Sequence, residues 1–140
     1  MNAVPGATGT SSSNNLGYTV KINNTGLTIS NYNTTNVVSS ILLSNDGMYL
    51  ATWAIQLQAT GAPTDIFSNI AYNNISGTSN AGGLGYSNWG MTRIGNILYG
   101  SSGSYIIQGQ AGYYCNLIMT VDGGSGFSTP SISYNLTRLS

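Results

Sequence analysis

Few side chains in this sequence could carry out acid–base or metal chemistry. The carboxylates are Asp46, Asp65 and Asp122, the only thiol is Cys115, and histidine and glutamate are absent. Catalytic Ser-His-Asp and Cys-His arrangements need histidine as the base, so both are excluded. A zinc site needs more than one cysteine or histidine. We therefore expect a protein that is not an enzyme and that holds no metal or cofactor.

Two kinds of site built on aspartate stay open. Calcium binds several oxygen ligands, so the three aspartates would have to combine with backbone carbonyls. A hydrolase with paired carboxylates would need two of the three aspartates to converge. Each aspartate lies in or near a predicted turn, where aspartate commonly stabilises the backbone. We expect this structural role for all three.

Cys115 lies in the apolar stretch 113–121. A single cysteine excludes an intrachain disulfide. We expect Cys115 to be buried as a small hydrophobic residue. The alternatives are an intermolecular disulfide and a reactive thiol.

The surface must be built almost without charge. Charged residues make up 4% of the chain, against about 25% in a typical protein. The six charges cancel, and they are Lys21, Asp46, Asp65, Arg93, Asp122 and Arg138.

Nucleic-acid binding depends on a basic patch, and anionic lipids attract polybasic segments. The sequence has neither a basic patch nor a polybasic segment. No apolar run reaches the ~20 residues of a membrane span. We expect no nucleic-acid partner, no membrane insertion, and a place on a virion surface or outside the cell.

The chain divides into a short leader and one domain. Residues 1–16 are rich in Pro, Gly, Ser, Thr and Asn and show no apolar periodicity. Gly6 and Gly9 have the three-residue spacing of collagen, so the segment is either a flexible leader or the remnant of a collagen-like stalk. Residues 17–140 have the length of one domain.

The clearest strand covers residues 48–58 and follows Asn45-Asp46-Gly47, which is a strong β-hairpin signal after the strand predicted at 37–43. One face of this strand is apolar throughout and consists of Tyr49, Ala51, Trp53, Ile55 and Leu57. The other face is partly apolar, with Met48, Leu50 and Ala54 among polar residues. A strand that is apolar on both faces is expected to be covered by another sheet or another chain.

Short strands are also predicted along the rest of the domain. They cover residues 18–22, 27–29, 37–43, 66–72, 91–99, 105–107, 113–121 and 131–139. Glycine-rich turns are predicted at 100–103, 109–112 and 123–126, and a long loop at 75–90. No segment has helical apolar spacing. About eight to ten short strands predict an all-β antiparallel sandwich, and the jelly roll is its eight-stranded form.

Two stretches resemble C1q/TNF-like jelly-roll heads. Residues 44–53, SNDGMYLATW, resemble the G-x-Y-containing strand of that family. Residues 133–139, SYNLTRL, resemble the terminal strand of its microbial and viral members. The spacing of the predicted strands fits that family over residues 17–140. Ala51, however, stands where the family often has an aromatic residue. The sequence also has no recognisable calcium-ligand cluster to carry over.

The resemblance implies a homotrimer with an outward-facing head, and it does not supply a ligand. The residues expected in the core or the trimer interface are Met48, Tyr49, Leu50, Trp53, Tyr113 and Tyr114.

A ligand could be bound by the 75–90 loop. Tyr86 and Trp89 could stack on a sugar ring while Asn88 bonds its hydroxyls. The alternative is that Trp89 folds back and plugs one end of the sandwich. The N-x-[ST] sequences begin at Asn23, Asn33, Asn74 and Asn135. A chain this rich in Asn, Ser and Thr contains such sequences by chance, so by themselves they do not indicate glycosylation.

Three functions follow from these observations. The leading hypothesis is the trimeric head of a collagen-like surface fibre of a giant virus, a virophage or a bacterial spore, which is structural or attaches to a host glycan or receptor. The bias toward Asn, Ile, Tyr and Thr suits an AT-rich viral genome. The alternatives are a stand-alone carbohydrate-binding lectin-like jelly roll and a minor capsid or cement protein without a ligand.

Overall fold

The computed structural model describes residues 19–24, 27–28, 36–76, 88–89, 91–93 and 95–140. Within these residues the chain forms ten strands and no helix, and every strand pair is antiparallel. The all-β prediction is confirmed. In the same part of the chain, no helix is long and apolar enough to cross a membrane. The leader predicted at 1–16 lies outside the described residues.

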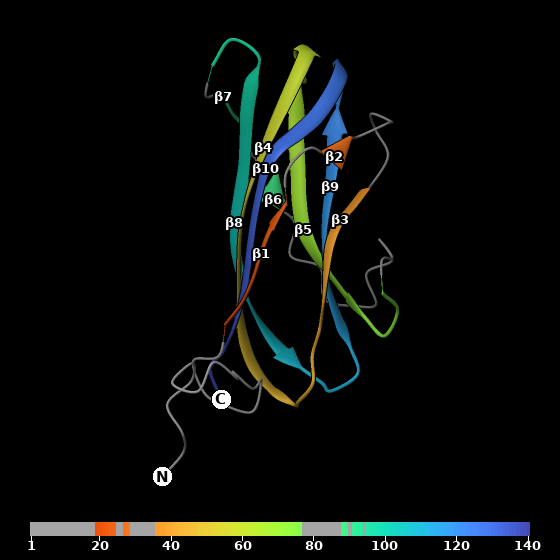
Figure 1. Ribbon diagram of the computed structural model, residues 1–140, viewed down its shortest axis with the longest axis vertical. Coiled ribbons are helices and arrows are strands. Elements are labelled where there is room, and N and C mark those ends of the chain that lie inside the picture. The colour runs from red at the N-terminus through yellow and green to blue at the C-terminus, as the bar shows by residue number, and fades with distance from the viewer. Residues whose placement is uncertain (1–18, 25–26, 29–35, 77–87, 90, 94) are drawn as a thin grey trace.

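Two sheets form the domain (Figure 1). Sheet A has the order β1 (Thr19–Asn24), β10 (Ser125–Arg138), β4 (Gly47–Gly61), β8 (Leu98–Gly109) and β7 (Thr92–Arg93), and β2 (Leu27–Thr28) also pairs with β10. Sheet B has the order β3 (Asn36–Leu42), β9 (Tyr114–Asp122), β5 (Asp65–Asn73) and β6 (Asn88–Trp89). In Figure 1, β8 and β1 lie on the left, and β3, β5 and β9 on the right.

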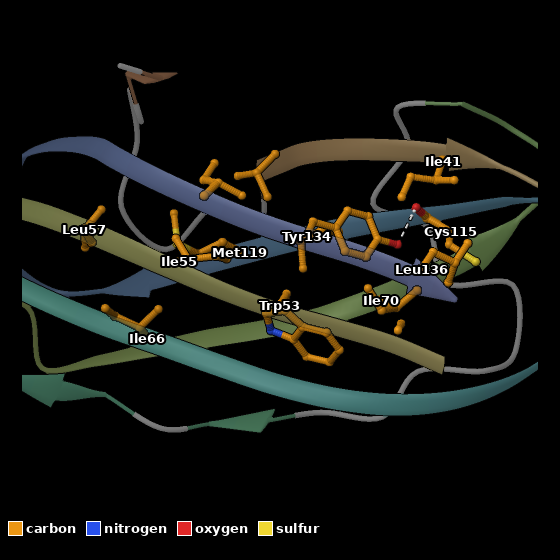
Figure 2. Packing of buried hydrophobic residues seen from close by; sticks show 14 of the residues in the cluster. Ile41, Trp53, Ile55, Leu57, Ile66, Ile70, Cys115, Met119, Tyr134 and Leu136 are labelled. Carbon is orange, nitrogen blue, oxygen red and sulfur yellow. Dashed lines mark hydrogen bonds between the residues drawn. The ribbon is translucent and has the colours of Figure 1, made fainter. Parts of the chain in front are cut away.

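The core lies between the two sheets and is built by alternation along the strands. The predicted apolar face of β4 is buried from Tyr49 to Leu57, which confirms that prediction. Across the core, every residue of β9 from Cys115 to Met119 is buried, and Cys115, Leu117 and Met119 belong to the apolar cluster between the sheets. Figure 2 shows side chains from both sheets meeting in this layer. Burial of these apolar surfaces is the main force that holds the sheets together.

Trp53 on β4 joins the two sheets through a polar contact inside the apolar core. Its indole Nε1–H donates to the hydroxyl of Ser68 on β5, at 2.9 Å. The Ser68 hydroxyl lies 2.7 Å from that of Ser101 on β8, and these two groups share a second hydrogen bond. Since a buried donor without a partner costs about 1–3 kcal/mol, the two serines make it possible to bury a tryptophan here.

A second polar contact crosses the core at Tyr134. The Tyr134 hydroxyl donates to the backbone carbonyl of Cys115, at 2.9 Å (Figure 2). Cys115 is fully buried, as predicted. In the described part of the chain, every buried side-chain nitrogen and oxygen has a hydrogen-bond partner. The core is therefore apolar packing with its few polar groups satisfied.

The prediction of a turn at residues 100–103 was wrong. β8 runs without interruption from Leu98 to Gly109 and includes these small residues. The reason is the shape of the core: a Cβ atom added to Gly103 would overlap the indole ring of Trp53. Glycine at 103 makes room for the largest core side chain on the neighbouring strand.

Two other sequence predictions also needed correction. The strand predicted at 91–99 is divided, because the backbone N–H of Gly95 donates to the carbonyl of Leu98 and forms a turn between β7 and β8. The loop predicted at 75–90 contains the short strand β6, which pairs with Phe67 and Ser68 of β5. Strands of two residues leave too little periodicity to be recognised in a sequence.

We expect Gly103→Ala to destabilise the fold by about 1–3 kcal/mol, as in other overpacked cores, because the added methyl group displaces the Trp53 ring. Gly95→Ala is the matched control, since its added Cβ would meet nothing closer than Leu98 at 3.7 Å. Chemical denaturation of both variants measures the difference. Equal stability of the two variants would contradict this account of Gly103.

Candidate functional site

On the outer face of sheet A, three described strands bring uncharged side chains together. Residues of β4 that point away from the core lie beside outward residues of β8 and β10. Leu50 lies opposite Ile106 of β8 and Thr137 of β10, and Thr52 lies opposite Ser104 and Asn135. Three adjacent strands therefore form a continuous face.

One end of this face carries an apolar patch, formed by Met48, Leu50, Ile106 and Leu139. Ile106 is 53% exposed and Leu139 is 44% exposed. The backbone N–H of Leu139 donates to the carbonyl of Met48, at 2.7 Å, which continues the β10–β4 pairing to the end of the chain. Exposed aliphatic side chains that lie next to one another mark an interaction surface more often than isolated ones do.

The rest of the face is small, polar and uncharged. Beyond the apolar patch, its central rows are Thr52, Ala54, Ser102, Ser104, Ser133 and Asn135. The charge nearest to it on these strands is that of Arg138, whose Nη2 donates to the carbonyl of Asp46 at 3.1 Å and whose Nε donates to the carbonyl of Ser140. Arg138 thus binds the β3–β4 turn instead of adding a charge to the face.

The residues predicted as core or interface occupy different places. Tyr49 and Trp53 are core residues, 3% and 4% exposed, and the Tyr49 hydroxyl donates to the carbonyl of Asn45. Met48 and Leu50 lie on the outer face of sheet A.

The two remaining predicted residues, Tyr113 and Tyr114, lie where sheet B begins. Tyr113 stacks on Tyr72 with ring centroids 5.0 Å apart. Tyr114 begins β9 and lies beside Leu42 and Asn73.

Ile106 and Leu139 were not singled out from the sequence. The alternation around residues 105–107 predicts a strand, but it does not show which strand lies beside it. Only the β4–β8 register places Ile106 next to Leu50.

The predicted sugar-binding residues are placed only in part. The backbones of Asn88 and Trp89 form β6 at the edge of sheet B, opposite Ser68 and Phe67. Tyr86 and the side chains of Asn88 and Trp89 lie outside the described part of the chain. Sugar binding and plugging by Trp89 both stay predictions.

The aspartates separate into a pair and a single residue. Asp65 and Asp122 lie directly opposite each other across β5 and β9, while Asp46 lies at the other end of the domain. Asp46 accepts a hydrogen bond from the backbone N–H of Ala111, and Asp65 from that of Ile66, each at 2.8 Å. In the part of the chain that the structure describes, no three cysteine, aspartate or other metal-binding side chains lie together. The observed contacts of Asp46 and Asp65 stabilise the backbone.

No family model and no curated protein matches this chain. We therefore infer the function from the geometry of the described residues and from the resemblance in the sequence.

Burial affects the titration of one thiol and three phenols. It raises the pKa of the Cys115 thiol from 9.0 to about 12. It also raises the pKa values of Tyr49, Tyr72 and Tyr134 above 10.0, and that of Tyr134 well above. In each case desolvation of the charged form is the largest cause. All four groups are neutral at physiological pH.

These shifts predict a stability that falls only in alkali. An acid whose pKa is raised by folding contributes its full stability below the unfolded pKa and loses it as the pH rises toward the folded pKa. For Cys115 the window is pH 9 to about 12. With no histidine to titrate near neutrality, the melting temperature should be nearly constant from about pH 5 to 8 and should fall above about pH 9.

Thermal melts across this pH range, at low and high salt, test the prediction. Cys115→Ala should lose less stability than the unaltered protein between pH 9 and 12, although it is less stable at pH 7. A midpoint that moved by more than about 10 °C between pH 5 and 8 would correspond to several kcal/mol. It would contradict the prediction and indicate a strongly coupled aspartate site.

Proposed function

We propose that this domain is the non-enzymatic head of a homotrimeric surface fibre, exposed on a virion or outside the cell, with a structural role, an attachment role or both. Three copies associate through the outer face of sheet A. The observation that carries the proposal is that this face is continuous across β10, β4 and β8, uncharged, and apolar at one end.

The strand order supports a jelly roll. Three strands have only two residues each, and they are β2, β6 and β7. When β6 is counted and β2 and β7 are left out, eight strands remain in the described chain. Counted from one to eight along the chain, these strands have the order 1-8-3-6 in sheet A, which is β1-β10-β4-β8. In sheet B they have the order 2-7-4-5, which is β3-β9-β5-β6. Such an order is expected when a chain folds into two sheets through two Greek keys. A jelly roll is also the fold of the C1q/TNF-like heads that residues 44–53 and 133–139 resemble.

The chemistry of the face suits association with copies of the same chain. Charged residues are depleted at the centre of protein interfaces, because each charge must lose its water. Here the centre has small polar side chains and the aliphatic anchors Leu50 and Ile106. A closed ring of copies covers such a surface without forming a filament.

The positions of the strand ends support a fibre with a defined direction. Thr19 at the start of β1 pairs with Thr137 near the end of β10, so the described chain enters and leaves the sandwich at one end. The apolar patch lies at the same end, since Leu50 also pairs with Thr137. In the proposed fibre, this end faces the stalk, and the β4–β5 and β9–β10 turns face outward.

We expect Leu50→Asp with Ile106→Asp to convert the trimer into folded monomers. In one chain Ile106 is exposed and Leu50 is half-buried on the outer face, so we expect the fold to tolerate both aspartates. In the assembly, each aspartate would bury an unpaired charge. Such a charge costs about 3–5 kcal/mol, and every 1.4 kcal/mol weakens association about tenfold.

Light scattering after size-exclusion chromatography, together with circular dichroism, measures the effect. Leu42→Asp is the matched control, because Leu42 on β3 of sheet B is 50% exposed, much as Ile106 is. It should leave the trimer intact. A trimer that survived the double substitution, or that dissociated equally with Leu42→Asp, would exclude this face as the interface.

A further inference from the structure

The four N-x-[ST] sequences are not equivalent once the chain is folded. Asn135 lies in the middle of β10, partly buried, opposite Thr52 on one side and Lys21 on the other. Asn23 pairs within β1 as backbone, and the side chains of Asn23 and Asn33 lie outside the described part of the chain. Asn74 lies elsewhere, in the turn that follows β5.

The turn at Asn74-Ile75-Ser76 combines an exposed acceptor sequence with a fixed backbone. All three residues are exposed. The side-chain oxygen of Asn73 accepts a hydrogen bond from the backbone N–H of Ile75, at 2.8 Å. The carbonyl of Ile75 accepts one from Nδ2 of Asn116, at 3.1 Å, and Asn116 is fully buried. The hydrogen bonds of Ile75 to Asn73 and Asn116 therefore fix the backbone of the turn, while Asn74 faces solvent.

We propose that Asn74 is an acceptor site for an N-linked glycan. The donor is an oligosaccharide joined to a lipid pyrophosphate, and an oligosaccharyltransferase catalyses the transfer. Nδ2 of Asn74 forms a bond to C1 of the first sugar, the bond between C1 and the pyrophosphate oxygen breaks, and the lipid pyrophosphate leaves. The amide nitrogen loses one proton to the transferase. Ser76 supplies the hydroxyl that completes the acceptor sequence.

The surroundings of Asn74 suit an attached sugar. Ile75 is 60% exposed, more than the other large apolar side chains of the described chain, and a glycan on the neighbouring residue would cover it. The turn extends from β5 of sheet B and is bonded to Asn116 of β9. A glycan there leaves the outer face of sheet A free, so the site does not depend on the proposed trimer.

Secretion of the full chain from eukaryotic cells behind a cleavable signal sequence tests the site. Peptide mapping of secreted and cell-retained protein, before and after enzymatic removal of N-glycans, should show a glycan on the peptide that contains Asn74. Asn74→Gln and Ser76→Ala should each abolish that glycan, and Asn135→Gln should leave it unchanged. The melting temperature should change by less than about 2 °C when the glycan is removed, which corresponds to less than about 1 kcal/mol for a domain of this size.

Two results would overturn the proposal. One is an Asn74 peptide without a glycan in both secreted and cell-retained protein. The other is a glycosylated chain that fails to fold and is rescued by Asn74→Gln.

A glycan placed on the opposite sheet separates this proposal from that of the trimer. Ser102→Asn creates an acceptor sequence that is completed by Ser104, on the outer face of sheet A. In the Asn74→Gln background, a glycan at position 102 should give monomers, whereas the glycan at Asn74 should leave the trimer intact. A protein that is monomeric without any glycan would contradict the proposed trimer but not the glycan site. A trimer that dissociates when Asn74 carries a glycan would contradict the placement of Asn74 outside the interface.

Discussion

The burial of Trp53 between the sheets is the constraint on which much of the structure depends. An indole ring of this size needs space on the facing and neighbouring strands, and its N–H needs an acceptor in a region without water. Gly103 on β8 provides the space, and Ser68 on β5 provides the acceptor. Because Ser68 also bonds Ser101, three strands from two sheets are fixed relative to one another at this point.

The arrangement of the interior also decides what the exterior can do. Successive side chains of a strand point to opposite faces, so placing Trp53 inside places Thr52 and Ala54 outside. The same alternation turns Met48 and Leu50 outward beside the buried Tyr49. The set of residues that β10, β4 and β8 present on the outer face of sheet A is therefore a direct consequence of the pairing that builds the core. The β4–β8 register that places Gly103 opposite Trp53 also brings Leu50 beside Ile106.

The sequence was most informative where the deciding forces are local. The alternation from Tyr49 to Leu57 and the burial of Cys115 follow from the residues themselves or their immediate neighbours, and the structure confirms them. The hairpin predicted at residues 45–47 was wrong, because β3 and β4 lie in different sheets and this segment connects one sheet to the other. The turn predicted at residues 100–103 was wrong because glycine is typical of turns in a sequence, whereas Gly103 makes room for a side chain fifty positions away. The apolar patch and the opposition of Asp65 and Asp122 depend on register, which pairs residues that are distant in sequence. Periodicity predicts that a strand exists but does not predict its partner.

Sedimentation equilibrium of the unaltered chain tests the central claim, which is that the outer face of sheet A is an interface between copies of this domain. The account predicts a single species with three times the mass of one chain at micromolar concentration. It also predicts that high salt changes the association little, because the central rows of the face on β10, β4 and β8 contain no charged residue. A chain that stays monomeric up to about 100 µM would contradict the claim. At that concentration, copies that associate with a Kd of about 1 µM would be almost entirely assembled.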